Sequence, residues 1–182
     1  MNICFHFPAN AGTFALPAIK NVWLNLVSSC VERRSNRYPI ANGSFSIPKR
    51  LRLYFMYDRS LLAKLSQCAW KVLSVYLKQG VSLDDPNPGA VIAVQTFGDF
   101  LNFNPHLHII ATDGCFDQDG GFMVGTVPDA SLLEELFRPQ VFSMLKKEGK
   151  INDAMHHSGF NVYCGKSIRP WDREGRNHPN AV

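Results

Sequence analysis

Residues 90–112 read AVIAVQTFGDFLNFNPHLHIIAT, and this stretch decides the expected fold. Ala90–Phe97 and His106–Thr112 are both apolar and rich in residue types that favour β-strands. The connection Gly98–Pro105 is short enough to join antiparallel neighbours. The stretch therefore predicts a β-hairpin.

Two histidines flank one leucine in the second strand of this predicted hairpin. Side chains alternate along a strand, so His106 and His108 project from one face, about 7 Å apart, while Leu107 and Ile109 project into a core. Two imidazoles held on an apolar scaffold can chelate a metal ion. The same short pattern also fits two partly exposed histidines at a sheet edge, and it occurs in zinc and iron sites too.

A third metal ligand is expected nearby. If Phe97 lies opposite His106, then Gln95 lies opposite His108 and on the same face. Gln95 is therefore the first candidate, unless it is only a polar residue that fills the sheet face. Asp99 in the connection is the second candidate. Asp113, in a Thr-Asp-Gly sequence, is interpreted as a turn residue.

The rest of the chain predicts an α+β fold, with a mostly antiparallel sheet flanked by helices. Apolar residues spaced three and four apart predict one helix after Asp58, ending near Gly80, and a second that Asp129 opens. A further helix is expected near 19–31. Additional strands are expected at 45–47, 122–124 and 160–164.

Composition narrows the class of protein. No apolar run approaches the 18 residues needed to span a bilayer, and the N-terminus is a poor secretory signal. The five cysteines form no CxxC pair, which argues against a disulfide framework and a cysteine zinc knuckle. We therefore expect a soluble, cytoplasmic protein with no membrane contact.

Charge is divided unevenly along the chain. Residues 1–83 carry eleven Lys and Arg against two acidic residues, a balance of +9, whereas residues 84–182 have a balance of −5. A basic half suggests a polyanionic partner, although a solvated surface of mixed sign is the alternative.

Basic residues in the first half are interleaved with aromatic ones. Lys49, Arg50 and Arg52 precede Tyr54 and Phe55, an arrangement that offers phosphate contacts beside rings on which unpaired bases stack. Alternatively, the two aromatic residues belong to the core. The stripe Lys64, Lys71, Lys78 on the first predicted helix either extends this track or is an ordinary solvated face.

Several segments together carry a family resemblance. The span QTFGDFLNFNPHLH (95–108), followed by TDGCF (112–116), resembles the two-tyrosine HUH transposases of bacterial rolling-circle-type insertion sequences. Further matches are FSIPKRLR (45–52), YDR (57–59), CAW (68–70) and HSGFNVYCG (157–165). The resemblance implies a divergent, partly helical leader at 1–43, an HUH-type domain at 44–170 and a polar tail at 171–182.

The resemblance also implies a chemistry and a bacterial, cytoplasmic setting. In this family the histidine pair, here His106 and His108, and one further polar residue bind Mg²⁺ or Mn²⁺, which polarises a phosphate of single-stranded DNA at the transposon ends. A tyrosine oxygen then attacks, leaving a 5′-phosphotyrosyl bond and a free 3′-hydroxyl, and a second tyrosine allows the transfer to be repeated.

The chain departs from this family at the nucleophile. The family's tyrosine pair lies after the histidines and spaced four apart, but Tyr163 is the only tyrosine after His108 and lies in a strand-like segment. Tyr54 and Tyr57 are three apart and upstream, and residues 1–43 lack the usual cysteine-rich zinc segment. A frameshifted or truncated copy of a transposase accounts for these departures. The alternatives are a degenerate module that binds metal and single-stranded DNA without nicking, and a cupin-like metal-dependent enzyme.

Overall fold

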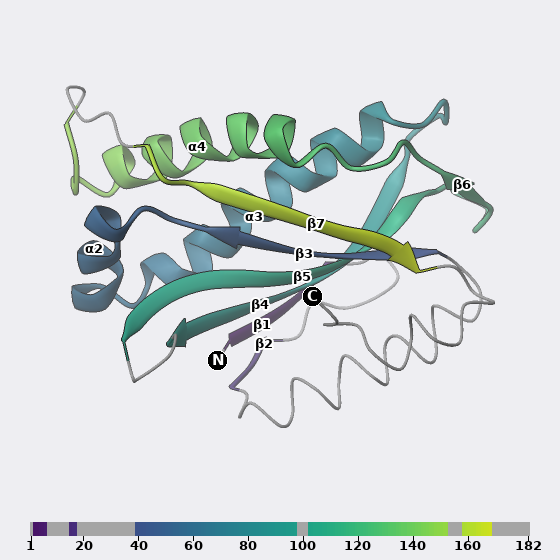
Figure 1. Ribbon diagram of the computed structural model, residues 1–182. Helices are drawn as coiled ribbons and strands as arrows, with labels where there is room; N and C mark the ends of the chain where they lie inside the picture. The colour runs from purple at the N-terminus through teal and green to yellow at the C-terminus, as the bar shows by residue number, and fades with distance from the viewer. Residues whose placement is uncertain (1, 7–14, 18–38, 98–101, 153–157, 169–182) are drawn as a thin grey trace.

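The computed structural model describes residues 2–6, 15–17, 39–97, 102–152 and 158–168 (Figure 1). These residues form eleven helices and strands in the following chain order: β1 (Asn2–His6), β2 (Ala15–Pro17), β3 (Ile40–Ser46), η1 (Lys49–Leu51), α2 (Arg52–Tyr57), α3 (Leu61–Gln79), β4 (Asn87–Phe97), β5 (Phe103–Phe116), β6 (Phe122–Val124), α4 (Ala130–Lys147) and β7 (Asn161–Ile168).

One open sheet organises the described residues. Its seven strands follow the order β2-β1-β4-β5-β3-β7, with β6 added to β5, and every described pairing is antiparallel. With α2, α3 and α4 beside the sheet, this arrangement confirms the expected α+β class. An open sheet is not the double-sheet barrel of a cupin, so the structure excludes that alternative.

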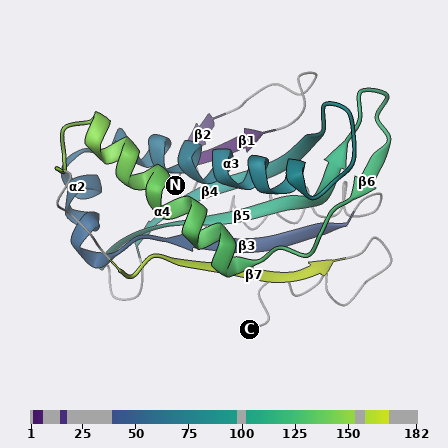
Figure 2. The ribbon, with the colours of Figure 1, turned by 90° about the horizontal axis from the view of Figure 1, so that it is seen from above.

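Helices α3 and α4 lie on the same face of the sheet, as Figures 1 and 2 show. Alternate residues of the central strands pack beneath them. The rings of Phe45 in β3 and Phe137 in α4 pack edge to face, with 5.0 Å between their centroids. Leu107 of β5 is fully buried in the same core. Because strand side chains alternate, the residues between these apolar ones project from the other face. Both histidines are among them.

The expected hairpin is confirmed as β4 and β5, although both strands are longer than predicted. The interpretation of Asp113 as a turn residue is wrong, because β5 continues through it to Phe116 and its side chain is buried. The turn lies further on, where the Asp117 carboxylate accepts hydrogen bonds from the N–H groups of Asp119 and Gly121. A Thr-Asp-Gly sequence favours a turn locally, but pairing with β6 keeps the segment extended.

The start of α4 was predicted correctly, whereas the predicted start of α3 was wrong by two residues. Asp129 caps α4, and its carboxylate accepts from the N–H groups of Ser131 and Leu132. The N-cap of α3 is Ser60, not Asp58. The Asp58 carboxylate instead accepts hydrogen bonds from the N–H and the hydroxyl of Ser60, and these bonds form a turn that directly precedes the helix.

Part of the predicted leader belongs to the same sheet. β1 pairs with β4, and β3 begins at Ile40, before the boundary expected after residue 43. The three-part division of the chain stays a prediction. The helix expected near 19–31 and the tail at 171–182 lie outside the described residues. Among the described helices, none is long and apolar enough to cross a membrane.

Candidate metal and nucleic-acid site

The register of the central hairpin places Gln95 directly across from His106, and Ala93 across from His108. The expected pairing of Phe97 with His106 is therefore wrong by two residues. An irregularity between Gln95 and Phe97 brings Phe97 opposite Phe103 instead. A shift of two keeps every side chain on its face, so Gln95 still shares a face with both histidines.

The two histidines lie side by side on β5. Their ring centroids are 4.9 Å apart and the rings are inclined by 67°. The residues after each of them, Leu107 and Ile109, are buried beneath the helices. The apolar side of β5 thus fixes the backbone that carries the imidazoles on the opposite face.

A backbone hydrogen bond fixes the tautomer of His106. Its Nδ1 lies 2.7 Å from the carbonyl oxygen of Asn104. A carbonyl can only accept, so Nδ1 must carry the proton and the ring donates this bond. In the neutral ring, the lone pair is then on Nε2. Metal-binding histidines are commonly oriented in this way by a partner on the second nitrogen.

His108 is held in its neutral form. Burial of the ring lowers its pKa below the ordinary value, and the neighbouring His106 lowers it further. A neutral imidazole has a lone pair available for a cation, whereas a protonated one has none. His108 therefore presents a nitrogen donor beside the Nε2 of His106.

Oxygen donors lie beside these nitrogens. The Gln95 side-chain N–H donates to the Phe97 carbonyl at 3.0 Å, which leaves its amide oxygen as the atom able to bind a cation. The side-chain oxygen of Asn104, two residues before His106, is buried with no hydrogen-bond partner. Asp99 lies outside the described residues, so its candidacy stays a prediction.

The chemistry of these donors fits a divalent cation. Two imidazoles with amide oxygens suit a transition metal such as Mn²⁺ better than Mg²⁺, which prefers an all-oxygen shell. No cluster of three or more His, Cys, Asp and Glu occurs in the part of the chain that the structure describes. A third protein ligand among these described residues would therefore be another oxygen donor, such as the Gln95 amide. The sequence analysis did not identify Asn104. Its contact with His106 is made by its backbone carbonyl, which every residue type has, so no residue pattern indicates it.

Strands β3 and β7 extend the histidine face sideways. Ser46 of β3 pairs with His106 on one side and with Asn161 of β7 on the other. Ser44 likewise pairs with His108 and with Tyr163. Directly paired residues in antiparallel strands project from the same face. Tyr163, expected in a strand-like segment, therefore shares their face and is 42% exposed.

The cations predicted to contact DNA fall into two separate regions. Lys49 and Arg50 are exposed in η1, three and four residues beyond Ser46 and so at the histidine end of β3. Arg52 is partly buried, which lowers the pKa of its guanidinium, and its Nε has no partner. Tyr54 packs partly against the core and Phe55 is completely buried, so Phe55 belongs to the core.

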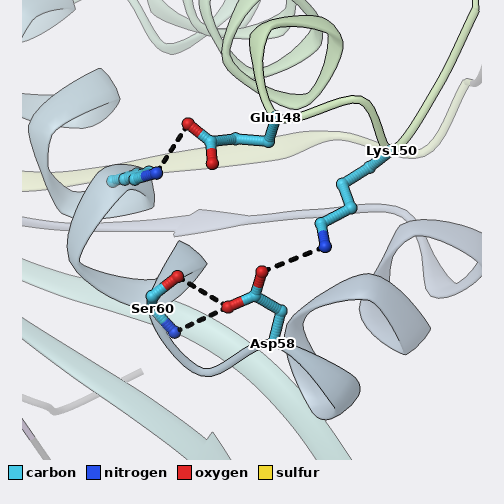
Figure 3. A network of polar contacts seen from close by, with 5 residues as sticks. Asp58, Ser60, Glu148 and Lys150 are labelled. Atoms are coloured by element: carbon cyan, nitrogen blue, oxygen red, sulfur yellow. Dashed lines mark hydrogen bonds and ion pairs between the residues drawn. The ribbon is translucent and has the colours of Figure 1, made fainter.

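Lys64 and Lys71 lie on the helical layer. With Lys147 and Glu148 they line a groove of about 300 Å³ between α3 and α4. Glu148 forms an ion pair with Lys64, and nearby Asp58 pairs with Lys150 at 3.0 Å (Figure 3). The histidines project from the other face of the sheet, so the structure does not bring these lysines to the candidate metal site.

Comparison with known protein families identifies one match. Residues 89–169 match a family described as "Putative transposase". The matched segment is less than half of the chain, and it contains most of the central hairpin, both histidines and Tyr163. Comparisons with curated proteins and with solved structures give no match.

Proposed function

We propose that this protein acts in DNA transposition, and that its histidine face binds single-stranded DNA beside a divalent cation, Mg²⁺ or Mn²⁺. The match of residues 89–169 to a transposase family supports a DNA partner. The observation that carries the metal site is the hydrogen bond from His106 Nδ1 to the Asn104 carbonyl, which leaves Nε2 beside the neutral ring of His108.

The residues of this face have separate roles in the proposal. His106 and His108 supply nitrogen ligands, and the amide oxygen of Gln95, directly across from His106, is the third. A bound cation would act as a Lewis acid on a phosphate of the DNA. Lys49 and Arg50, at the same end of β3, attract the phosphate backbone.

Titration of the purified chain with metal and with DNA tests this function. The wild type should bind Mn²⁺ more tightly than Mg²⁺, because nitrogen donors favour the later metal. It should also bind a labelled oligonucleotide more tightly in Mn²⁺ than in a chelator. The double variant His106→Ala, His108→Ala should lose the Mn²⁺ heat and the metal dependence of DNA binding. Equal heats for the two proteins would refute the metal site.

Strand cleavage is the second candidate function. Tyr163 shares the histidine face, but two strand spacings separate its backbone from that of His108, so binding without cleavage is the outcome we expect. In that reaction the tyrosine oxygen would bond to phosphorus as the bond from phosphorus to the 3′-oxygen breaks. The products would be a 5′-phosphotyrosine and a DNA 3′-hydroxyl that takes up a proton. A chain that binds metal and DNA without this step is the degenerate module considered above. The formation of a covalent adduct distinguishes the two.

A further inference from the structure

The two rows of paired residues beside the histidines form a surface of defined composition. One row runs from His106 through Ser46 to Asn161, and the other from His108 through Ser44 to Tyr163. In each row a small serine lies between two larger side chains. Neighbouring strands are about 4.8 Å apart, so each row spans about 10 Å from β5 to β7.

The side chain at the end of the second row is an accessible aromatic ring. Tyr163 is 42% exposed, and Asn161 beside it on β7 is exposed as well. The residue between them, Val162, is buried towards the helices. An aromatic ring on a sheet face, flanked by polar groups, is the arrangement on which sheet-based proteins stack unpaired bases.

The charges on this surface suit a polyanion. Strands β3, β4, β5 and β7 contain one carboxylate among their described residues, that of Asp113. Asp113 is buried near the opposite end of β5, five residues beyond His108. Exposed cations lie on both sides of the rows along the strand direction, with Lys49 and Arg50 beyond Ser46 after β3 and Lys166 three residues beyond Tyr163 on β7.

We infer that a single strand of DNA crosses β3 from the histidine pair to β7, and that the ring of Tyr163 stacks on an unpaired base of that strand. The inference rests on the proposed function, since it takes the phosphate beside the histidines as its starting point. Ser44 and Ser46 lie under the crossing strand, and their small size leaves room for it. Asn161 offers an amide to base edges or phosphates. Tyr163 is thus a DNA-binding residue that acts through its ring and not through its hydroxyl.

Three variants of the full chain test this role by fluorescence anisotropy with a labelled single-stranded oligonucleotide in Mn²⁺. Tyr163→Ala should weaken binding about tenfold, because it removes the stacking surface. Tyr163→Phe keeps the ring and should bind like the wild type. Tyr57→Ala is the matched control, since Tyr57 is 83% exposed on α2 and lies off the sheet. It should also bind like the wild type.

Other outcomes would overturn either the inference or the proposed function. Binding by Tyr163→Ala at the wild-type level would overturn the inference, as would an equal loss in Tyr163→Phe, which would assign the effect to the hydroxyl. An equal loss in Tyr57→Ala would place the stacking surface elsewhere and would overturn it too. If the wild type itself shows no binding to single-stranded DNA, the proposed function fails instead. Circular dichroism melting of each variant establishes that it is folded.

A probe in the DNA places the contact directly. An oligonucleotide with one 2-aminopurine should lose fluorescence on binding the wild type and Tyr163→Phe, because the probe stacks on the ring. It should keep more of its fluorescence with Tyr163→Ala. Identical quenching by all three proteins at saturation would contradict stacking on Tyr163, whatever the affinities.

Discussion

Gln95 on β4 is the cross-strand partner of His106 on β5, and its side-chain N–H is engaged by the Phe97 carbonyl. The amide group is therefore oriented, with its oxygen left to bind a cation beside the imidazole. This relationship makes Gln95 the described side chain best placed to complete the proposed metal site.

Replacement of Gln95 tests the third ligand. Gln95→Leu keeps a side chain of similar size and removes the oxygen, and we expect it to weaken Mn²⁺ binding by about 10-fold. Gln95→Glu replaces a neutral oxygen with a carboxylate and should strengthen the binding of both Mn²⁺ and Mg²⁺. Calorimetric titration measures both. Unchanged affinities in the two variants would exclude Gln95 as a ligand.

The salt dependence of DNA binding should locate the phosphate contacts. If Lys49 and Arg50 each neutralise one phosphate, the slope of log K against log salt should become shallower by about 1.4 in the double alanine variant. Lys64→Ala, Lys71→Ala removes the same charge from the helical layer and is the matched control, with an expected unchanged slope. A shallower slope in the control alone would move the DNA track to the groove between α3 and α4.

Local sequence patterns were sufficient to predict the hairpin and the face of the histidines. Apolar residues at alternate positions of β5 identified the buried side, and the even spacing of His106 and His108 placed both on the other side. The register was not predictable in the same way. It depends on the irregularity between Gln95 and Phe97. This irregularity lies across from the part of β5 that contains Pro105, a residue with no N–H for the ladder.

The contribution of β7 could not be predicted from local patterns at all. Tyr163 comes to the histidine face because β7 pairs with β3, which pairs in turn with β5. These pairings join residues more than fifty positions apart, and no short motif encodes them. The hydrogen bond from His106 to the Asn104 backbone was equally hidden, since any residue type offers a carbonyl.

The close approach of β5 and β6 at Gly114 predicts a large effect of one methyl group. A Cβ at Gly114 would lie 2.0 Å from the Met123 carbonyl oxygen, and the backbone φ of +154° adds strain. We expect Gly114→Ala to lower the free energy of unfolding by about 1–3 kcal/mol or more. At Gly125 in the same hairpin, the nearest atom to a Cβ is 3.5 Å away. Gly125→Ala should therefore be nearly neutral, and equal urea midpoints for the two variants would contradict this account.

The free energy of unfolding should fall in acid, because the Asp58 carboxylate loses its stabilising contacts when it is protonated. Its hydrogen bonds to Ser60, and then its contact with Lys150, hold the pKa of the carboxyl below the ordinary value of 3.8. The lowered pKa means that this stabilisation is complete above 3.8 and is lost as the pH falls through the folded-state value. Asp58→Asn should thus have a lower Tm than the wild type at pH 7. At low pH, where the wild-type carboxyl is protonated, the Tm values of the two proteins should be closer together. A constant Tm difference at every pH would argue against the carboxylate's role.

The last prediction is that this chain forms no covalent adduct with DNA at the rate of a tyrosine transposase. Such a reaction needs a tyrosine oxygen held in line with the phosphate, and positioning of this kind contributes several kcal/mol, roughly 7–11 in the best cases. Tyr163 is the only tyrosine after His108, and two strand spacings, about 10 Å, separate their backbones. We therefore expect metal-dependent DNA binding without attack. Incubation with labelled single-stranded DNA and Mn²⁺, followed by denaturing electrophoresis, measures the adduct. A shifted protein band that Tyr163→Phe abolishes would make Tyr163 the nucleophile, whereas one abolished by Tyr54→Phe or Tyr57→Phe would assign that role upstream.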